Sequence, residues 1–386
     1  MNRLHSLIIS LSLVGCATNG TTATGDDDDG SGGKADGSSS ILFSAEGPSE
    51  FKLEGALEPA FRAAHAGEPD GIFPPMRVMD PFPGRVGYGD VMVDAELQLR
   101  GNSSIQECEF AKLKFKTDKA QSKDTAFDGA RKIKIGTHCG EGGGGVIGRL
   151  REEKATWREA AIYPMMRALQ MNAQLAKPVS FTYLDTSTNE SLTRKAFIFE
   201  HIDLTAGRLG GEPIDDPETW TGDPAETMEM QSIVRAHFFE ALVGNWDWWI
   251  KLGPSRSTGG QLWNVEAISF GDKLEPLLSD FDLSSAVTGS PIKENALDAR
   301  VLPAEPDLLV RQAAHYLAYK FGSQFSDDEL HAARDHFVER RADVEAVIEQ
   351  VPIDDEGRDN LRAHVVAFYK ALESLDVIIA AVRVAN

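Results

Sequence analysis

The hydrophobic pattern of this 386-residue sequence changes its period near residue 204, and this change constrains the fold more than any other feature. Before that point apolar residues alternate with polar ones, as they do in half-buried strands. The clearest run is Val91, Val93, Ala95, Leu97 and Leu99. After that point apolar residues recur every three to four positions, as they do in amphipathic helices. The sequence therefore predicts an α+β fold with a β-rich first half and a mostly helical second half.

Individual elements follow from the same patterns and from turn residues. In the first half we expect strands at residues 91–99, 111–116, 132–135, 179–184 and 196–199, and one helix at 157–169. In the second half we expect a helix at 226–243, strands at 262–268 and 274–279, a helix after the capping box Ser326–Glu329, and a helix at 361–384.

Residues 1–15 have the features of an export signal. A basic start at Arg3 precedes an apolar stretch from Leu7 to Val14, which is shorter than the about 20 residues that span a bilayer. Leu13-Val14-Gly15-Cys16 has the form of a lipobox, in which the cysteine receives a lipid. A plain secretory signal with an incidental Cys16 is the alternative. We therefore expect an exported chain, in the periplasm or on the cell surface, that is held at a bacterial membrane only by lipid on Cys16.

Residues 16–40 are small, polar and acidic, and they lack any apolar period. Such a segment buries too little surface to offset its ordering entropy, so we expect a flexible tether. One domain should follow at 41–386, with an N-lobe at about 41–203 and a C-lobe at about 204–386. The formal net charge of −21 argues against a nucleic-acid partner, because such binding needs clustered Lys and Arg.

Two cysteines remain for the folded part, Cys108 and Cys139. Outside the cytosol, two thiols most simply form one disulfide. Two separately buried thiols are the alternative. The sequence has no Cys/His spacing that resembles a zinc site.

Lysines lie in the β-rich half and acids in the helical half, in an order that suits phosphoryl transfer. That reaction uses a Lys held by a Glu, an Asp that orients the attacking hydroxyl, and an Asn and an Asp that hold Mg²⁺. The acids are Asp247 and the pair Asp280 and Asp282, with Asn264 between them. Each alone could be only a cap or turn former.

Eight short motifs, in order over about residues 90–290, resemble those of the CotH kinase family. They are Leu99-Arg100-Gly101-Asn102-Ser103, Cys108-Glu109-Phe110-Ala111-Lys112-Leu113, Lys134-Ile135-Gly136-Thr137-His138-Cys139, Arg158-Glu159, Phe199-Glu200-His201-Ile202-Asp203, Gly244-Asn245-Trp246-Asp247, Asn264-Val265 and Asp280-Phe281-Asp282-Leu283-Ser284. The family consists of secreted or spore-surface proteins with a pared-down kinase-like fold. Two departures stand out: Trp263 replaces the usual His before the Asn, and Phe110-Ala111 replaces prolines.

The resemblance implies a two-lobed, atypical protein-kinase-like fold and a role for each matched residue. Asp247 is the catalytic residue, which accepts the proton of the substrate hydroxyl or orients that hydroxyl. Asn264 and Asp280 bind Mg²⁺ or Mn²⁺, with Asp282 as the alternate or second metal acid. For the ATP phosphates, Lys112 is the first choice of lysine and Lys134 the second, and Glu159 holds that lysine. Arg100 and Asn102 lie in the turn over the phosphates. Glu200 to Ile202 form the hinge whose backbone faces adenine.

The expected activity is transfer of the ATP γ-phosphate to Ser or Thr of an envelope or surface protein. Two alternatives stay open. The first is a catalytically inactive pseudokinase that binds nucleotide, metal or a partner. The second is a structural lipoprotein whose acids are surface turns.

Overall fold

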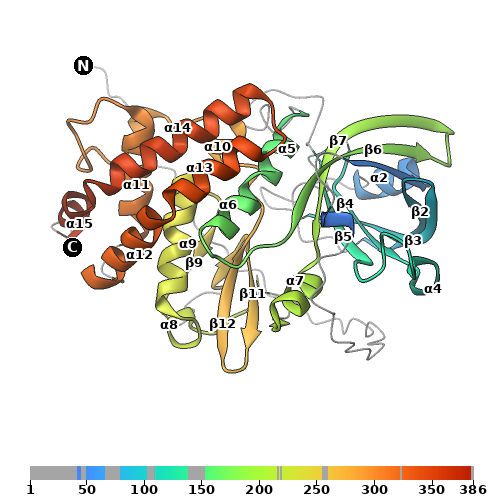
Figure 1. Cartoon of the computed structure of the whole chain (residues 1–386), viewed down its shortest axis with the longest axis horizontal. Helices are drawn as coiled ribbons and strands as arrows, with labels where there is room; N and C mark the ends of the chain where they lie inside the picture. The colour runs from blue at the N-terminus through green and yellow to red at the C-terminus, as the bar shows by residue number, and fades with distance from the viewer. Residues whose placement is uncertain are drawn as a thin grey trace, which may run out of the picture.

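The computed structural model describes residues 41–44, 49–65, 79–101, 108, 110–137, 153–214, 217, 220–253, 260–321 and 324–383. A β-barrel forms one side of the molecule and a group of helices forms the other (Figure 1). The predicted α+β class, with a β-rich first half and a helical second half, is confirmed. The predicted signal segment, Cys16 and the tether lie outside the described residues.

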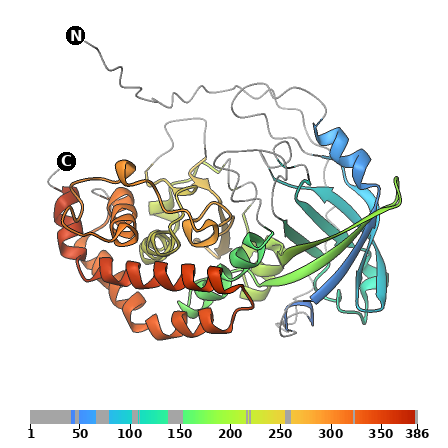
Figure 2. The same ribbon diagram turned by 90° about the horizontal axis from the view of Figure 1, so that it is seen from above.

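Seven strands close the barrel, in the order β1-β2-β3-β4-β5-β7-β6. They are β1 (Ser49–Gly55), β2 (Phe82–Tyr88), β3 (Val91–Leu99), β4 (Leu113–Thr117), β5 (Lys132–Thr137), β6 (Ala176–Asp185) and β7 (Glu190–Glu200). Neighbouring strands are antiparallel except β1 and β6, which pair in parallel with Phe51 opposite Phe181. The barrel therefore closes through two segments that are far apart in the sequence, and Figure 2 shows β1 beside the long β6–β7 ribbon.

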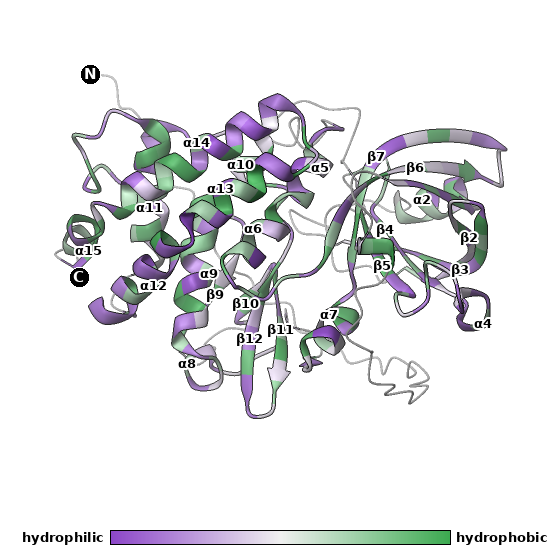
Figure 3. Cartoon of the chain, viewed as in Figure 1, coloured by the Kyte–Doolittle hydropathy of each residue, from purple (hydrophilic) through white to green (hydrophobic). Residues whose placement is uncertain are grey.

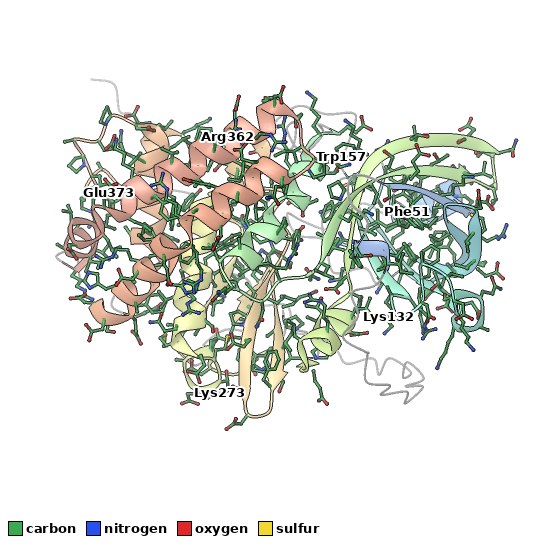
Figure 4. All side chains as sticks on the ribbon, in the orientation of Figure 1. Phe51, Lys132, Trp157, Lys273, Arg362 and Glu373 are labelled. Carbon is green, nitrogen blue, oxygen red and sulfur yellow. The ribbon has the colours of Figure 1, made fainter. Side chains whose placement is uncertain are left out.

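Aromatic side chains fill the barrel. Phe51 is buried and lies 5.1 Å from Phe181 and 6.4 Å from Phe127, between ring centroids. Figure 4 shows Phe51 among the barrel strands. Along β3 the burial alternates, because successive side chains of a strand point to opposite faces. The alternation that predicted this strand is thus the packing of one face into the barrel.

Two short helices, α5 (Ala155–Ala160) and α6 (Ile162–Ala168), connect β5 to β6 where one helix was predicted at 157–169. Trp157 Nε1 donates a hydrogen bond to the Val179 carbonyl at 3.0 Å, and this fixes α5 against β6. Figure 4 shows Trp157 at the junction between the barrel and the helices.

The helical half is built around α9 (Met230–Val243), whose side chains are mostly buried. The other helices are α7 (Ile202–Leu209), α8 (Pro224–Thr227), α10 (Ser285–Thr288), α11 (Leu308–Phe321), α12 (Asp327–Glu339), α13 (Arg341–Gln350), α14 (Asp355–Leu372) and α15 (Leu375–Arg383). Figure 3 shows hydrophilic residues along the outer sides of α13 and α14. The predicted capping box at Ser326 is present, and the helix predicted at 361–384 is divided into α14 and α15.

Short strands complete the helical half. They are β8 (Glu212–Pro213), β9 (Trp249–Ile250), β10 (Leu262–Trp263), β11 (Val265–Phe270) and β12 (Lys273–Leu278). The remaining short elements are α1 (Ile41–Ser44), α2 (Leu57–His65), α4 (Lys119–Ser122) and the 3₁₀ turn Glu294–Ala296. Among the helices within the described ranges, none has the length and apolar character needed to cross a bilayer.

Candidate active site

The loop that carries Asp247 begins where α9 ends. Gly244 has a φ of 65°, the left-handed conformation that ends many helices. A side chain at Gly244 would collide with Ser285 Oγ and Gln312 Nε2, so only glycine fits. Asn245 Oδ1 then accepts a hydrogen bond from the Asp247 backbone N–H at 3.1 Å, which forms an Asx turn. Backbone chemistry thus fixes the start of the loop.

Two neutral donors hold the Asp247 carboxylate. Trp263 Nε1 donates to Oδ1 at 3.1 Å, and Asn264 Nδ2 lies 3.3 Å from Oδ2 and 2.6 Å from the Asp247 carbonyl. The Trp263 ring stacks on Trp249 with centroids 5.2 Å apart. Burial raises the pKa of Asp247, the bond from Trp263 opposes this rise, and the charges of Asp280 and Asp282 add to it. Asp247 is therefore an oriented carboxylate with increased basicity.

Asn264 and Asp280 have unusual backbones on the two sides of the β11–β12 hairpin. Their φ angles are 52° and 60°, in the left-handed region that few residues other than glycine adopt. The Ser279 backbone N–H donates to the Asn264 carbonyl at 3.2 Å, which ties the two segments together. Such conformations cost about 1–3 kcal/mol each and cluster at functional sites.

Lys112 joins the barrel to the acids of the helical half. Its Nζ lies 2.9 Å from Asp282 Oδ2 and 3.3 Å from Asp280 Oδ1. Lys112 is only 5% exposed and lies one residue before β4, not within the strand as predicted. Burial opposes its positive charge, but Asp280, Asp282 and Glu159 outweigh it and raise the pKa of Lys112. Lys112 therefore stays an ammonium.

The carboxylates respond differently to this lysine. Burial would raise the pKa of both acids, but Lys112 and Arg100 lower the pKa of Asp280, whereas the pKa of Asp282 stays raised. Burial and the repulsion of Asp282 raise the pKa of Glu159 to about 8. The hydrogen bonds of Lys112 go to Asp280 and Asp282, and Glu159 adds to the raised pKa of Lys112 only when it is ionised. The expected grip of Glu159 on Lys112 stays a prediction.

A buried ion pair fixes the helix that carries Glu159. Arg158 Nε and Nη2 bind Asp354 at 3.0 and 2.7 Å, and Nη2 also binds Glu356 at 3.0 Å. Gly357 lies so close that a Cβ there would meet the Arg158 Nε at 2.7 Å. Asp354 and Glu356 at the start of α14 therefore hold α5 in place through Arg158.

The other lysine candidate does not reach the acids. Lys134 on β5 forms an ion pair with Glu266 on β11, and its Nζ lies 5.7 Å from the centre of the Phe199 ring. Arg100 stacks over the same ring at 4.9 Å and donates to the Ile135 carbonyl at 3.2 Å. The structure thus places Lys112 among the acids, and Lys134 and Arg100 beside Phe199.

Glu200 has a structural partner at the predicted hinge. Its carboxylate accepts hydrogen bonds from Arg208 Nη2 at 2.7 Å and from the Leu175 backbone N–H at 2.9 Å. Its carbonyl accepts from Gln174 Nε2 at 2.9 Å, and Ile202 begins α7. The Glu200 side chain therefore anchors the connection between the halves, and the adenine-facing role of this segment stays a prediction.

Three predicted residues cannot be placed. Asn102, Cys139 and Cys16 lie outside the described residues. Cys108 is fully buried, and its pairing with Cys139 stays a prediction.

Trp263 and Tyr163 have no role in the prediction from sequence, but the fold places both in the site. In the sequence Trp263 is only a departure from the CotH pattern, although its position beside Asn264 could have suggested a polar contact. The Tyr163 hydroxyl is buried with no hydrogen-bond partner in the described part of the chain. Its ring centroid lies 6.0 Å from that of Phe199 and 5.5 Å from that of Phe281. Burial and the nearby charges of Glu159 and Asp280 raise the pKa of Tyr163.

The oxygen donors suit a hard divalent cation. Asp280 and Asp282 supply carboxylates, and Asn264 keeps Oδ1 for a ligand because Nδ2 donates to Asp247. Over the ranges that the structure describes, no group of three or more His, Cys, Asp or Glu side chains could hold a metal. A metal here would therefore depend on these few donors together with the oxygens of its substrate, as Mg²⁺ commonly does with phosphates.

No protein-family model matches the chain, and a search of curated proteins finds no match. The proinflammatory kinase CtkA of Helicobacter pylori is similar in structure, with a TM-score of 0.37 and 10% identity, over 70% of this chain and 91% of that one. HipA of the toxin–antitoxin system of Shewanella oneidensis MR-1, solved with HipB and operator DNA, gives a TM-score of 0.33 and 13% identity, over 88% and 75%. Both likenesses are distant, and we rest no functional conclusion on them. The CotH resemblance stays a prediction.

Proposed function

We propose that the chain is an exported, lipid-anchored protein kinase of the CotH type, which transfers the ATP γ-phosphate to Ser or Thr of an envelope or surface protein. One observation carries this proposal. Lys112 from the barrel forms ion pairs with Asp280 and Asp282 at the end of the β11–β12 hairpin. This arrangement places a cation for phosphate oxygens and acids for a metal at one point between the two halves.

Asp247 supports the proposal through its orientation. Trp263 and Asn264 are neutral donors, so they orient the carboxylate without neutralising it. Its raised pKa strengthens it as an acceptor for the proton of an alcohol. Asp247 can thus hold a substrate hydroxyl in line with the phosphate, which lowers the barrier by positioning.

Asp280, Asp282 and the Asn264 Oδ1 would hold Mg²⁺ or Mn²⁺. When bound, the metal supplies positive charge that stabilises the transferring phosphoryl group. Lys112 already neutralises part of the carboxylate charge, so it competes with a metal unless it moves toward phosphate oxygens or Glu159. Arg100, 4.9 Å above the Phe199 ring, is a second cation on the barrel side of the site.

The test compares single variants of the full chain. Asp280→Ala should remove the metal-dependent part of ATP-induced thermal stabilisation. Asp247→Ala should retain that stabilisation but lose transfer of labelled γ-phosphate, because positioning acts mainly in the transition state. Asp272→Ala is the matched control, since Asp272 is an exposed acid in the turn of the same hairpin. If the wild type shows no ATP-dependent stabilisation with Mg²⁺ or Mn²⁺, the proposed function is wrong.

A pseudokinase is the second candidate. Trp263 favours it, because the CotH motifs carry His at this position and Trp263 occupies Oδ1 of Asp247. Nucleotide-dependent stabilisation without transfer to any acceptor in an envelope lysate would establish this reading.

The anchor is tested separately. A Cys16→Ser variant should be exported without lipid and should appear in the soluble fraction. If it partitions into membranes as the parent does, the lipid-anchor part of the proposal is wrong, whatever the kinase assays show.

A further inference from the structure

A pocket of about 160 Å³ lies where four segments meet, and none of its lining residues belongs to the candidate active site. α1 contributes Phe43, the α5–α6 segment contributes Ala160 and Pro164, β6 contributes Lys177, and the chain after α13 contributes Val351 and Pro352. Its walls are therefore apolar apart from one lysine. The pocket lies between barrel and helices, where a bound molecule would contact both.

The lysine is buried, and none of the described residues forms a hydrogen bond with its amine. Lys177 is only 4% exposed, and its Nζ has no hydrogen-bond partner in the described ranges. Lys177 precedes Val179, Phe181 and Tyr183 on the buried face of β6, and the chain places a cation where the pattern calls for an apolar residue. Burial lowers the pKa of Lys177.

An ammonium in this position costs several kcal/mol when nothing pairs with it. Surface lysines avoid this cost by extending the amine into water, but the Lys177 Nζ is enclosed. Its pocket is lined by alanine, proline, valine and phenylalanine, which offer no side-chain acceptor. The group that would complete this site is an anion.

The size and polarity of the pocket narrow the class of anion. An apolar engineered cavity of about 150 Å³ accepts benzene, so this pocket fits a body of about six carbon atoms. A single buried cation with apolar walls matches one negative charge and disfavours a phosphate, which needs several donors. We propose that this pocket binds a small monocarboxylate with an apolar body, whose carboxylate pairs with the Lys177 ammonium when the side chain turns toward the pocket, because the Nζ is covered in the structure.

Such a ligand would stabilise the folded chain, because it binds only when α5–α6, β6 and the segment after α13 are together. The inference is independent of the proposed kinase activity. It rests on Lys177 and its pocket, so it can stand or fall without any result from ATP.

The test uses the full chain, with benzoate as the probe and benzamide as its uncharged counterpart. Benzoate should raise the melting temperature in a saturable way, and benzamide should bind at least about tenfold more weakly because it lacks the charge. The absence of a saturable benzoate response up to about 10 mM, which is weak even for a small ligand, overturns the proposal. Equal responses to benzoate and benzamide also overturn it, because the lysine would then contribute nothing.

Two variants locate the site. Lys177→Met keeps the length of the side chain and removes the charge, so it should abolish the benzoate response and leave the unliganded protein as stable as the wild type or more stable. Lys52→Met is the matched control, because Lys52 is an exposed lysine of the adjacent strand β1, and it should keep the full response. A Lys177→Met protein that folds and still responds to benzoate contradicts the assignment. If Lys177→Met does not fold, the benzoate-to-benzamide comparison in the wild type decides.

Discussion

Lys112 and Lys177 lie at the heads of two barrel strands and are almost equally buried, at 5% and 4% exposure. Their surroundings are opposite. Lys112 contacts two carboxylates, which raise its pKa despite burial. Lys177 has no such partner, and burial lowers its pKa. The partners of a buried lysine, and not its burial, therefore decide whether the lysine stabilises or destabilises the protein.

We expect the largest effect at a third buried cation, Arg158. Like Lys112, it forms ion pairs with carboxylates. Arg158→Met should destabilise the protein by about 3 kcal/mol, since it breaks a bidentate pair to Asp354 and leaves that carboxylate only the exposed Lys154, whose Nζ is 3.8 Å away. Urea unfolding measures the change. Arg362→Met is the control, because Arg362 forms ion pairs at the exposed surface and its loss should cost less than about 1 kcal/mol. Equal losses in the free energy of unfolding for the two variants would contradict the distinction between a buried ion pair and a surface ion pair.

Lys112→Met comes next and tests the comparison directly. It leaves Asp280 and Asp282 without their ion-pair partner and with only the more distant charge of Arg100, so it should cost about 2 kcal/mol. This is less than for a fully buried pair, because the Asp280 side chain is 42% exposed. The same substitution at Lys177 should not destabilise. Chemical denaturation of Lys112→Met and Lys177→Met in parallel measures the change in the free energy of unfolding for each. A Lys112→Met protein that is more stable than the wild type would contradict the role of its ion pairs.

Trp263→Phe tests the acid Asp247, which is held by neutral donors instead of a cation. Loss of the indole N–H removes a hydrogen bond to ionised Asp247, so the pKa of Asp247 should rise and the acidic limb of the kcat/KM profile should move to higher pH. We expect about a tenfold loss in kcat/KM, or about 1.4 kcal/mol. Trp249→Phe is the matched control, because it alters the stacked ring without touching Asp247. An unchanged pH profile of kcat/KM in Trp263→Phe would show that Trp263 does not tune Asp247.

Glu159→Gln should appear as a change in the pH dependence of stability. The pKa of Glu159 is raised from 4.5 to about 8, so the folded protein keeps a proton that the unfolded chain releases. Relative to Glu159→Gln, wild-type stability should be greatest below about pH 4.5 and should fall as the pH rises toward about 8. Unfolding free energies across this range measure the trend. Glu50→Gln, an exposed acid on β1, should follow the wild type.

The predictions from the sequence succeeded where the signal was local. The alternation at 91–99 became β3 with the same bounds, and the capping box at Ser326 formed. The strand that begins the barrel, β1, was not predicted, although Phe51 and Leu53 alternate with more exposed residues. Alternation marks a strand but does not specify its partner, so the parallel pairing of β1 with the distant β6 could not be predicted.

The candidate site divides in the same way. The motifs at Asp247, Asn264 and Asp280 could be found because their residue types are those of phosphoryl transfer. The CotH resemblance ranked Lys112 before Lys134, and Lys112 is the lysine that contacts Asp280 and Asp282. The strand pattern alone does not separate the two, because both look like solvent-facing lysines until β4 and β5 are placed. The roles of Trp263 and Tyr163 depend on where the indole N–H and the phenol point, which the sequence does not encode locally.

The parallel pairing of β1 with β6 has a consequence for how the chain is made. β1 is synthesised before β6, and its partner is complete only when Asp185 has been added. Until then β1 and β5, at the two ends of the incomplete sheet, have unpaired strand edges that could bind another chain, and contacts so distant in sequence form slowly. The growing polypeptide must therefore be kept apart from its neighbours during biogenesis, and folding of this half is expected to follow completion of the β6–β7 ribbon.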